Sequence, residues 1–503
     1  MKKILSTCLV SCIPFLGFAA EEYVGNQLPV VFAGPISYCH DNITDAIVLI
    51  DGRFLSTDSN VGKIDRERLF PILDAGSPKL VTSVIIQGGS NKGGGSPDTD
   101  EVNTRRMGSF RIYGSNDLEN WDLFWEGHEH PVSAYWILRV TRDSNTGASA
   151  AYKLETSKTP TMSTAEELGT FDDSSYPYST RYRYFRLESS PNADYKTINA
   201  CEFSLWSPDL AITANRPTVY SAAESLGAAD DPNGVTFSGK LTYSPTGSAD
   251  VYVAIHKDEF GADFDAWEAN GATIVKLAEG VASGSSFSVK VPNLGEGTLT
   301  SRIFAVAGDT TTAAPCSYRF ALGAEAVYPT VYVSNNSIDG ISTSHIQKTY
   351  DGNLGSHGDV NNGHNAHFVF DLTEIKANGY HPVAIRYWPR KGSLSVEKLR
   401  GRTSVIAATS DDIDFPEDMT SLSSDTRTLY LDSANTQKNA NWTIVEDLSW
   451  TQIDYQPLCY DIAIPKDIAL SAKYLKIYNT TMVHAREYEV RVMRNRTMMM
   501  IIK

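Results

Sequence analysis

The 503-residue chain lacks long stretches in which Ala, Leu, Glu and Lys recur with helical periodicity. Its apolar segments are short and rich in Val, Ile, Tyr and Phe, as at 80–86, 109–113 and 182–188, and turn-forming residues separate them. Short strands and frequent turns are typical of antiparallel sheets. The sequence therefore predicts an all-β chain, and its length predicts about three domains because one core rarely serves so many residues.

A basic tract is also missing. Lys and Arg number 44 against 60 Asp and Glu, which gives a formal net charge of −16. Nucleic acids and anionic membrane surfaces attract clusters of Lys and Arg, so this acidic chain is poorly suited to either. We expect a neutral or cationic ligand and no nucleic-acid partner.

Signatures of catalysis are equally scarce. The sequence contains no Gly-x-Ser-x-Gly elbow, no phosphate-binding glycine loop, no dinucleotide fingerprint and no zinc-ribbon spacing. The histidine pairs within 128–130 and 364–367 lack the helical spacing of zinc peptidases. We therefore expect no enzymatic activity. Glycoside hydrolysis stays open, because it needs two carboxylates facing across a cleft and sequence spacing does not show that.

The apolar N-terminal segment, 4–18, is shorter than the roughly 20 residues of a spanning helix. It follows two lysines and leads into Gly17-Phe18-Ala19, which places small residues where signal peptidase cuts. This pattern predicts a signal peptide over residues 1–20, and hence a secreted, periplasmic or cell-surface protein without a transmembrane segment. Lipoprotein processing at Cys12 is the alternative, although the apolar run continues past that residue.

Four cysteines remain after this cleavage: Cys39, Cys201, Cys316 and Cys459. They allow three pairings, and the sequence does not choose among them. Cys39 and Cys201 lie near opposite ends of one predicted domain, so a disulfide between them and two separate thiols both remain open. Cys316 and Cys459 fall in different predicted domains and are expected to be buried thiols.

A two-part signature occurs twice in the chain. Its first part is an Asp-Gly turn, at Asp51 and again at Asp351. Its second part is an Ala-x-Glu segment after a strand-like run, ending at Glu202 and again at Glu487. A similar length of chain separates the two parts in both copies. A repeat of this size is a domain rather than a short solenoid unit.

The signature and the boundaries between apolar segments predict three domains after the signal peptide. Residues 22–207 and 328–503 each contain one copy of the signature. Residues 211–323 alternate apolar and polar positions in short segments between turns, as expected for an immunoglobulin-like or fibronectin-like sandwich. The stretch 142–178 is longer than the first domain needs and predicts an inserted hairpin.

Each copy of the signature supplies oxygen ligands. An Asp-Gly turn exposes carbonyls and a carboxylate, and a Glu on the last strand reaches the same point if the first and last strands are neighbours. Ca²⁺ prefers such an oxygen-rich site. The candidate calcium ligands are Asp51, Asp58 and Glu202 in the first domain, and Asp351, Asp359 and Glu487 in the last. The alternative is that the aspartates only form turns and the glutamates face solvent.

Both end domains resemble the discoidin, or coagulation factor 5/8 type C, family of the galactose-binding-like superfamily. In the first domain the matching residues are 110–117 with Trp121, then 183–187; in the last they are 385–390 and the closing segment 473–491. The superfamily includes many carbohydrate-binding modules. The resemblance implies two jelly-roll β-sandwiches, each with a structural calcium near its Asp-Gly turn and with ligand-binding loops at one end.

The two copies differ where a sugar is expected to bind. Residues 87–89, Gln-Gly-Gly, stand in the first domain where 387–389, Tyr-Trp-Pro, stand in the last. An aromatic ring stacks on the apolar face of a sugar, and a guanidinium bonds hydroxyls with fixed geometry. The ligand-binding candidates therefore belong to the last domain: Trp388, Arg390, Arg402 and, as a weaker candidate, His357. The alternatives are strand packing for Trp388 and a structural ion pair for Arg390.

The sequence thus predicts a secreted, non-catalytic protein whose discoidin-like domains bind glycan, with repeated weak sites acting together. A structural or adhesion protein that binds protein partners through the same folds is the first alternative. An accessory part of a glycoside hydrolase system is the second, because no block of about 250 residues remains to form a catalytic barrel.

Overall fold

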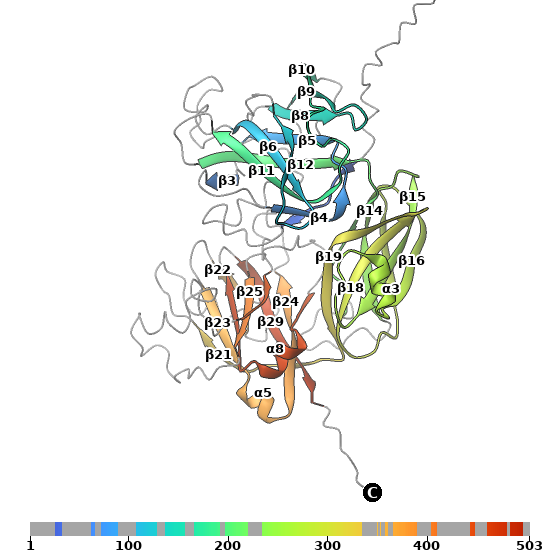
Figure 1. Cartoon of the computed structure of the whole chain (residues 1–503). Coiled ribbons are helices and arrows are strands. Elements are labelled where there is room, and N and C mark those ends of the chain that lie inside the picture. Colours follow the sequence, from blue (N-terminus) through green and yellow to red (C-terminus); the bar gives the residue numbers. More distant parts are fainter. Residues whose placement is uncertain are drawn as a thin grey trace, which may run out of the picture.

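The structure is a computed structural model of the whole chain (Figure 1). It describes residues 26–32, 62–65, 72–88, 107–127, 136–155, 165–191, 197–219, 234–333, 350, 353, 358–360, 366–389, 404–409, 443–447, 460–479 and 483–495. The predicted signal peptide, residues 1–20, lies outside them. Within the described residues antiparallel strands form six sheets, which confirms the prediction of an all-β chain.

The first sandwich packs two antiparallel sheets around one core. One sheet has the order β1-β12-β5-β8-β9-β10, with β3 also pairing with β12, and the other has the order β2-β4-β11-β6-β7. Alternate residues such as Val84 and Ile86 of β5 point inward, where they meet Phe185 of β11 and its neighbours. The strands of the first sheet are β1 (Asn26–Gln27), β3 (Gly62–Asp65), β5 (Ser83–Gly88), β8 (Trp136–Arg142), β9 (Ala148–Glu155), β10 (Glu166–Asp172) and β12 (Thr197–Ser207). Those of the second are β2 (Val31–Phe32), β4 (Ile72–Lys79), β6 (Met107–Ser115), β7 (Asp122–Glu126) and β11 (Tyr182–Pro191).

The last sandwich repeats this strand order. One sheet runs β20-β29-β24-β27, with β22 also pairing with β29, and the other runs β21-β23-β28-β25-β26. The closing strand β29 therefore corresponds to β12, and β24 corresponds to β5. The first sheet comprises β20 (Glu325–Val327), β22 (Gly358–Val360), β24 (Tyr380–Pro389), β27 (Tyr460–Ala463) and β29 (Val483–Arg494). The second comprises β21 (Thr330–Val333), β23 (Ala366–Asp371), β25 (Ser404–Thr409), β26 (Thr443–Asp447) and β28 (Tyr474–Asn479), and the short helices are α5 (Thr373–Ala377) and α8 (Lys466–Ser471).

The hairpin predicted within 142–178 is present. Strands β9 and β10 pair with each other and extend the sheet beyond β8. In the described part of the last sandwich no such pair follows β27, the strand that corresponds to β8. The first sandwich is thus the same strand arrangement with a hairpin added at one edge.

The middle sandwich is smaller and separates the two end sandwiches along the chain. A three-stranded sheet, β13-β14-β17, packs against a four-stranded sheet, β16-β15-β18-β19, to form a β-sandwich; its immunoglobulin-like character stays a prediction. In its core the rings of Phe237 and Phe320 meet edge to face with centroids 6.0 Å apart. The elements are β13 (Ala211–Ala214), β14 (Val235–Tyr243), β15 (Ser248–His256), α3 (Phe264–Ala269), β16 (Thr273–Ala282), β17 (Ser286–Val291), β18 (Gly297–Ala307) and β19 (Thr310–Leu322).

The helices of the described segments are short. None of them combines the length and the apolar composition that crossing a membrane would require.

Candidate functional site

In both end sandwiches the closing strand returns beside the strand that follows the Asp-Gly turn. Ala200 of β12 lies opposite Gly62 of β3, and Ala485 of β29 lies opposite Gly358 of β22. The alanines of the two Ala-x-Glu segments therefore occupy matching places. The calcium prediction requires the closing strand to lie next to the opening segment, and the pairing with β3 and β22 agrees with this for the strands that follow the Asp-Gly positions.

Most of the predicted calcium ligands are not described at the level of side chains. Three lie outside the described residues: Asp51, Asp58 and Asp351. For Glu202 of β12 and Asp359 of β22 only the strand position is described. Among the described residues no group of three or more His, Cys, Asp or Glu side chains is placed to hold a metal ion. Calcium binding stays a prediction.

The remaining predicted ligand, Glu487, is fully buried. It lies on β29 opposite Trp388 of β24, two residues along each strand from the pair formed by Glu489 and Arg386. Side chains two residues apart on a strand share a face, so these four side chains line one face of the sheet. That face is the outer one, because Tyr387 and Tyr488 point the other way and meet in the core with ring centroids 4.9 Å apart.

Ion pairs neutralise several of the charges on this face. Arg386 forms a two-pronged pair with Asp461 of β27, Nε to Oδ1 at 2.7 Å and Nη2 to Oδ2 at 3.0 Å, and both side chains are buried. Arg491 Nη1 donates to Glu489 Oε1 at 2.9 Å, and its Nη2 donates to the carbonyl of Ala324. Buried charges need such partners because removal from water costs several kcal/mol per ion.

Tyr328 lies next to the same carboxylates. It is 55% exposed, yet partial desolvation, followed by the negative charges of Glu489 and Glu487, raises its pKa to about 12. The phenol is therefore protonated at neutral pH, and it contributes no further charge to this end of β29.

Trp388, the residue predicted to stack on a sugar, is fully buried. Its side chain belongs to the hydrophobic cluster of the middle sandwich, which also contains Ile303 and Phe320. A ring without an exposed face cannot stack on a ligand, so the structure contradicts the sugar-stacking role of Trp388. The packing alternative is correct, with the packing partner supplied by a neighbouring domain.

The other ligand-binding candidates, His357, Arg390 and Arg402, lie outside the described residues, and their roles stay predictions. The described strands next to them nevertheless share one end of the sandwich. Ala485 lies opposite Gly358 on one side and Pro389 on the other.

Strand β25, which begins just after Arg402, starts at the same end of the sandwich. Ser404, just after Arg402, lies opposite Asn479, where β28 ends shortly before β29 begins at Val483. The chain thus enters or leaves the same end of the last sandwich next to His357, Arg390 and Arg402. We call this end, marked by Gly358, Pro389, Ser404 and Ala485, the loop end.

The first sandwich has an equivalent loop end with different residues. Ala200 lies opposite both Gly62 and Gly88, just as Ala485 lies opposite Gly358 and Pro389. Gln87 lies opposite Glu202 and is the counterpart of Trp388, one position from the predicted correspondence. A glycine-rich stretch therefore leaves β5 where Arg390 follows β24.

Sequence reasoning matched Tyr113, Trp121 and Arg186 to the family pattern but did not predict that they form one cluster on the outer face of the first sandwich. The guanidinium carbon of Arg186 lies 4.9 Å from the ring centroid of Tyr113 and 4.7 Å from that of Trp121. Nearby, Arg111 Nε donates to Glu126 Oε1 at 2.7 Å. The alternation of polar and apolar residues along β6 and β11 is the signal that would have placed these side chains together. Because Arg186 covers a face of each ring, the cluster joins the β6–β7 hairpin to β11.

The cysteines give a partial outcome. Cys39 and Cys459 lie outside the described residues, and Cys201 is described only by its place in β12. Cys316 is a thiol in β19, half-buried rather than fully buried as expected.

No family model matches the chain, and no curated protein matches it. Among solved structures it is similar to the CBM32 domain of AlyQ in complex with 4,5-unsaturated mannuronic acid, with 12% identity, TM-score 0.18, and coverage of 36% of this chain and 95% of that one. A SusE-like protein matches with 8% identity, TM-score 0.21, and coverage of 56% and 96%. A family 89 glycoside hydrolase from Clostridium perfringens in complex with PUGNAc matches with 11% identity and TM-score 0.21 over 53% of this chain, which spans only 30% of that enzyme. At TM-scores of this size none of these similarities bears on function.

Proposed function

We propose that this chain is a secreted, non-catalytic protein that binds glycan at the loop end of its last sandwich. The observation that carries the proposal is that the described strands next to His357, Arg390 and Arg402 begin or end at the same end of the sandwich. Gly358 and Pro389 both lie opposite Ala485, and Ser404 lies opposite Asn479 at the end of β28. The repeated strand order of the end sandwiches also fits the discoidin-like architecture, in which ligands bind to loops at one end.

The chemistry of the candidates supports a ligand rich in hydrogen-bond acceptors, such as the hydroxyl groups of a glycan. Two guanidinium groups and an imidazole supply many hydrogen-bond donors, and planar guanidinium groups bond pairs of hydroxyl oxygens with defined geometry. Trp388 is excluded from contact with the ligand because it is buried. We also propose that Ca²⁺ supports this end through Asp351, Asp359 and Glu487, since β22 and the start of β29 lie side by side there.

Affinity electrophoresis of the full chain against a panel of polysaccharides, with and without Ca²⁺, tests the proposal. We expect retardation by at least one polysaccharide, and a loss of roughly tenfold or more in affinity for Arg390→Ala, because a hydrogen bond from a charged group contributes about 1.5–3 kcal/mol. Arg494→Ala is the matched control, since Arg494 is an exposed arginine at the opposite end of the same closing strand.

Two results would contradict the proposal. One is the absence of retardation by every polysaccharide with Ca²⁺ present. The other is equal retardation of Arg390→Ala and the unsubstituted chain. Attachment to protein surfaces that survives Arg390→Ala would favour the adhesion alternative. Retardation that is unchanged by a chelator would overturn the calcium part alone.

A further inference from the structure

The first and middle sandwiches approach each other at backbone distance. Gly76 of β4 has φ +77°, and a Cβ atom there would lie 2.6 Å from Cα of Pro315 and 3.1 Å from the carbonyl oxygen of Ala314, both on β19. Real side chains do not tolerate such distances, so only glycine fits. Asp74 stabilises the backbone at Gly76 by accepting from the Gly76 N–H at 2.7 Å, and Arg183 donates twice to Asp74 at 2.8 Å.

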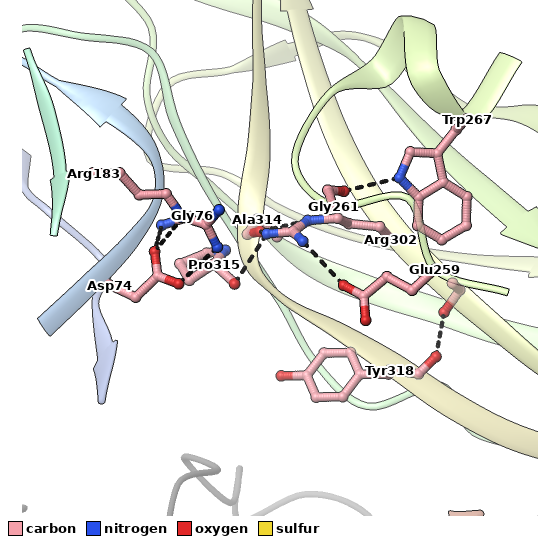
Figure 2. A network of polar contacts seen from close by, with 11 residues as sticks. Asp74, Gly76, Arg183, Glu259, Gly261, Trp267, Arg302, Ala314, Pro315 and Tyr318 are labelled. Carbon is pink, nitrogen blue, oxygen red and sulfur yellow. Dashed lines mark hydrogen bonds and ion pairs between the residues drawn. The ribbon is translucent and has the colours of Figure 1, made fainter. Parts of the chain in front are cut away.

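Figure 2 shows this contact from close by. Asp74, Gly76 and Arg183 of the first sandwich lie next to Pro315, whose carbonyl accepts from Arg302 of β18 at 3.1 Å. Arg302 is almost fully buried and also donates to the carbonyl of Ala314 at 2.9 and 3.2 Å. The part of β19 that receives Gly76 is therefore fixed from behind by the middle sandwich itself.

A buried lysine crosses the same boundary. Lys79 of β4 is 4% exposed, and its Nζ donates to the carbonyl of Leu210 at 2.6 Å and to the hydroxyl of Thr312 on β19. Ser77 Oγ also lies 3.0 Å from the Thr312 hydroxyl. A lysine ammonium so far from water needs these acceptors, because an unpaired buried charge costs several kcal/mol.

The linker between these sandwiches is bound to the first of them. Asp209 accepts from the Leu80 N–H at 2.7 Å and twice from Arg181 at 3.0 Å. Lys79 also donates to the carbonyl of Leu210, so hydrogen bonds from the first sandwich fix both Asp209 and Leu210 in the linker between β12 and β13.

A second interface joins the last sandwich to the middle one. Trp388 of β24 fills a place in the middle sandwich's hydrophobic cluster. Close by, Ala321 of β19 and Ala324 of the linker pack with Val383 and Ala384 of β24 in a separate small cluster. These small side chains allow close approach of the strands. Arg491 holds the linker by donating to the carbonyl of Ala324.

We propose that the middle sandwich is a rigid bracket in which the single strand β19 holds both end sandwiches, so that the two loop ends are presented at one fixed separation. Strand β19 contacts β4 of the first sandwich and both β24 and β27 of the last. Domains joined by small polar interfaces move relative to each other. Here the close packing of Gly76 against the backbone of β19, together with the buried side chains of Lys79 and Trp388, opposes such motion. The role of Trp388 is therefore to anchor one domain on another.

Single-molecule energy transfer in the full chain measures the separation directly. Dyes on unnatural amino acids avoid the native cysteines, and they are placed at Glu119, Glu279 and Leu470, which are exposed residues of the first, middle and last sandwiches. We expect one narrow distribution of transfer efficiency for each dye pair. A broad distribution for the 119–470 pair in the unsubstituted chain would overturn the proposal, whether or not any glycan binds.

A pair of glycine variants isolates the first interface. Gly76→Ala adds a methyl group that must displace β19, whereas Gly247→Ala adds one at a similar φ, +84°, with nothing within 4 Å. Both variants pay the same cost of a left-handed alanine. We expect Gly76→Ala to broaden the 119–279 and 119–470 distributions and to leave 279–470 narrow, while Gly247→Ala changes none.

Trp388→Ala isolates the second interface. It should broaden the 279–470 and 119–470 distributions and leave 119–279 unchanged, because the side chain lost belongs to the contact between the middle and last sandwiches. If either variant leaves all three distributions as narrow as in the unsubstituted chain, β19 does not hold the end sandwiches and the proposal is wrong.

Discussion

Individual charged residues are buried in this protein at places where one sandwich meets another. Lys79 lies between the first and middle sandwiches, and Arg491 lies beside the linker to the last. Lys and Arg side chains are usually exposed to solvent, so the sequence alone gives no reason to expect these two at a buried interface. Their role follows from the carbonyls that they hold, since each fixes a linker as it leaves a sheet.

Lys79 gives the first-to-middle interface a dependence on pH. Burial lowers its pKa to about 8, while the nearby Asp209 carboxylate opposes that shift. Between this pKa and the ordinary lysine value of 10.5 the unfolded chain binds more protons than the folded one. The free energy of unfolding therefore rises with pH in this window, by about 2 kcal/mol over 1.5 pH units.

Urea unfolding of the unsubstituted chain and of Lys79→Met at a series of pH values from 7.5 to about 9.5 measures this contribution. We expect the difference in unfolding free energy between the two proteins to change steeply from about pH 8 upward, and to be flat below it. Lys276→Met is the control, because Lys276 is exposed and paired with Asp250 on the surface. A pH-independent difference for Lys79→Met would show that its ammonium is charged throughout.

Trp388 shows why a site residue can be misread from sequence. A tryptophan near the end of a strand, with an arginine two residues later, is consistent both with stacking on a sugar and with packing against another domain. The deciding fact is which domain covers the outer face of β24, and that depends on contacts between residues far apart in the chain. Residue type and spacing predict the strand but not which domain packs on it, so the sequence predicts a ligand-facing ring where the structure has a ring buried against the middle sandwich.

At the scale of elements, the repeat was predictable and the added strands partly so. Each end sandwich contains one copy of the signature, and the closing strands β12 and β29 that carry the Ala-x-Glu segments pair with β3 and β22, the strands that follow the Asp-Gly positions in the sequence. The excess length of 142–178 indicated a hairpin, found as β9 and β10. Strand order was accessible only through the family resemblance, because local periodicity does not specify which strands pair.

The pairing of β27 with β24 depends on a buried ion pair. Arg386 and Asp461 lie opposite each other in the two strands, with exposed side-chain fractions of 0% and 2%. Asp461→Ala removes the carboxylate that accepts from Nε and Nη2 of Arg386, and breaking this buried pair is expected to lower the free energy of unfolding of the last sandwich by about 3–5 kcal/mol. Calorimetry of the full chain measures this as an unfolding transition of the last sandwich that moves to a lower temperature or separates from the rest.

The double variant Arg386→Met with Asp461→Leu is the matched control for that experiment. It removes both charges and retains apolar volume, and replacing a buried ion pair in this way is often neutral or stabilising. We therefore expect the double variant to be more stable than Asp461→Ala alone. Equal losses in the two proteins would mean that side-chain packing, rather than the charge left behind, decides the stability of this strand pair.

For the whole molecule, the bracket and the proposed glycan site together predict a preference for polymers. This prediction takes the loop end of the first sandwich as a second, weaker glycan site, as the repeated weak sites predicted from the sequence imply. Two such sites held at a fixed separation gain from a ligand that reaches both, because the second contact becomes intramolecular. We expect the unsubstituted chain to bind a recognised polysaccharide on the order of a hundredfold more tightly than the short oligosaccharide of the same repeat.

Gly76→Ala separates this effect from simple binding. It lies far from Arg390 in the chain and alters only the contact with β19, so its affinity for the short oligosaccharide should equal that of Gly247→Ala. Its affinity for the polysaccharide should fall by roughly tenfold, because loosened sandwiches lose effective concentration. Titration calorimetry measures the oligosaccharide and affinity electrophoresis the polymer. Equal polymer affinity in the two variants would show that one loop end binds alone, and then the bracket serves to position the last sandwich rather than to pair it with the first.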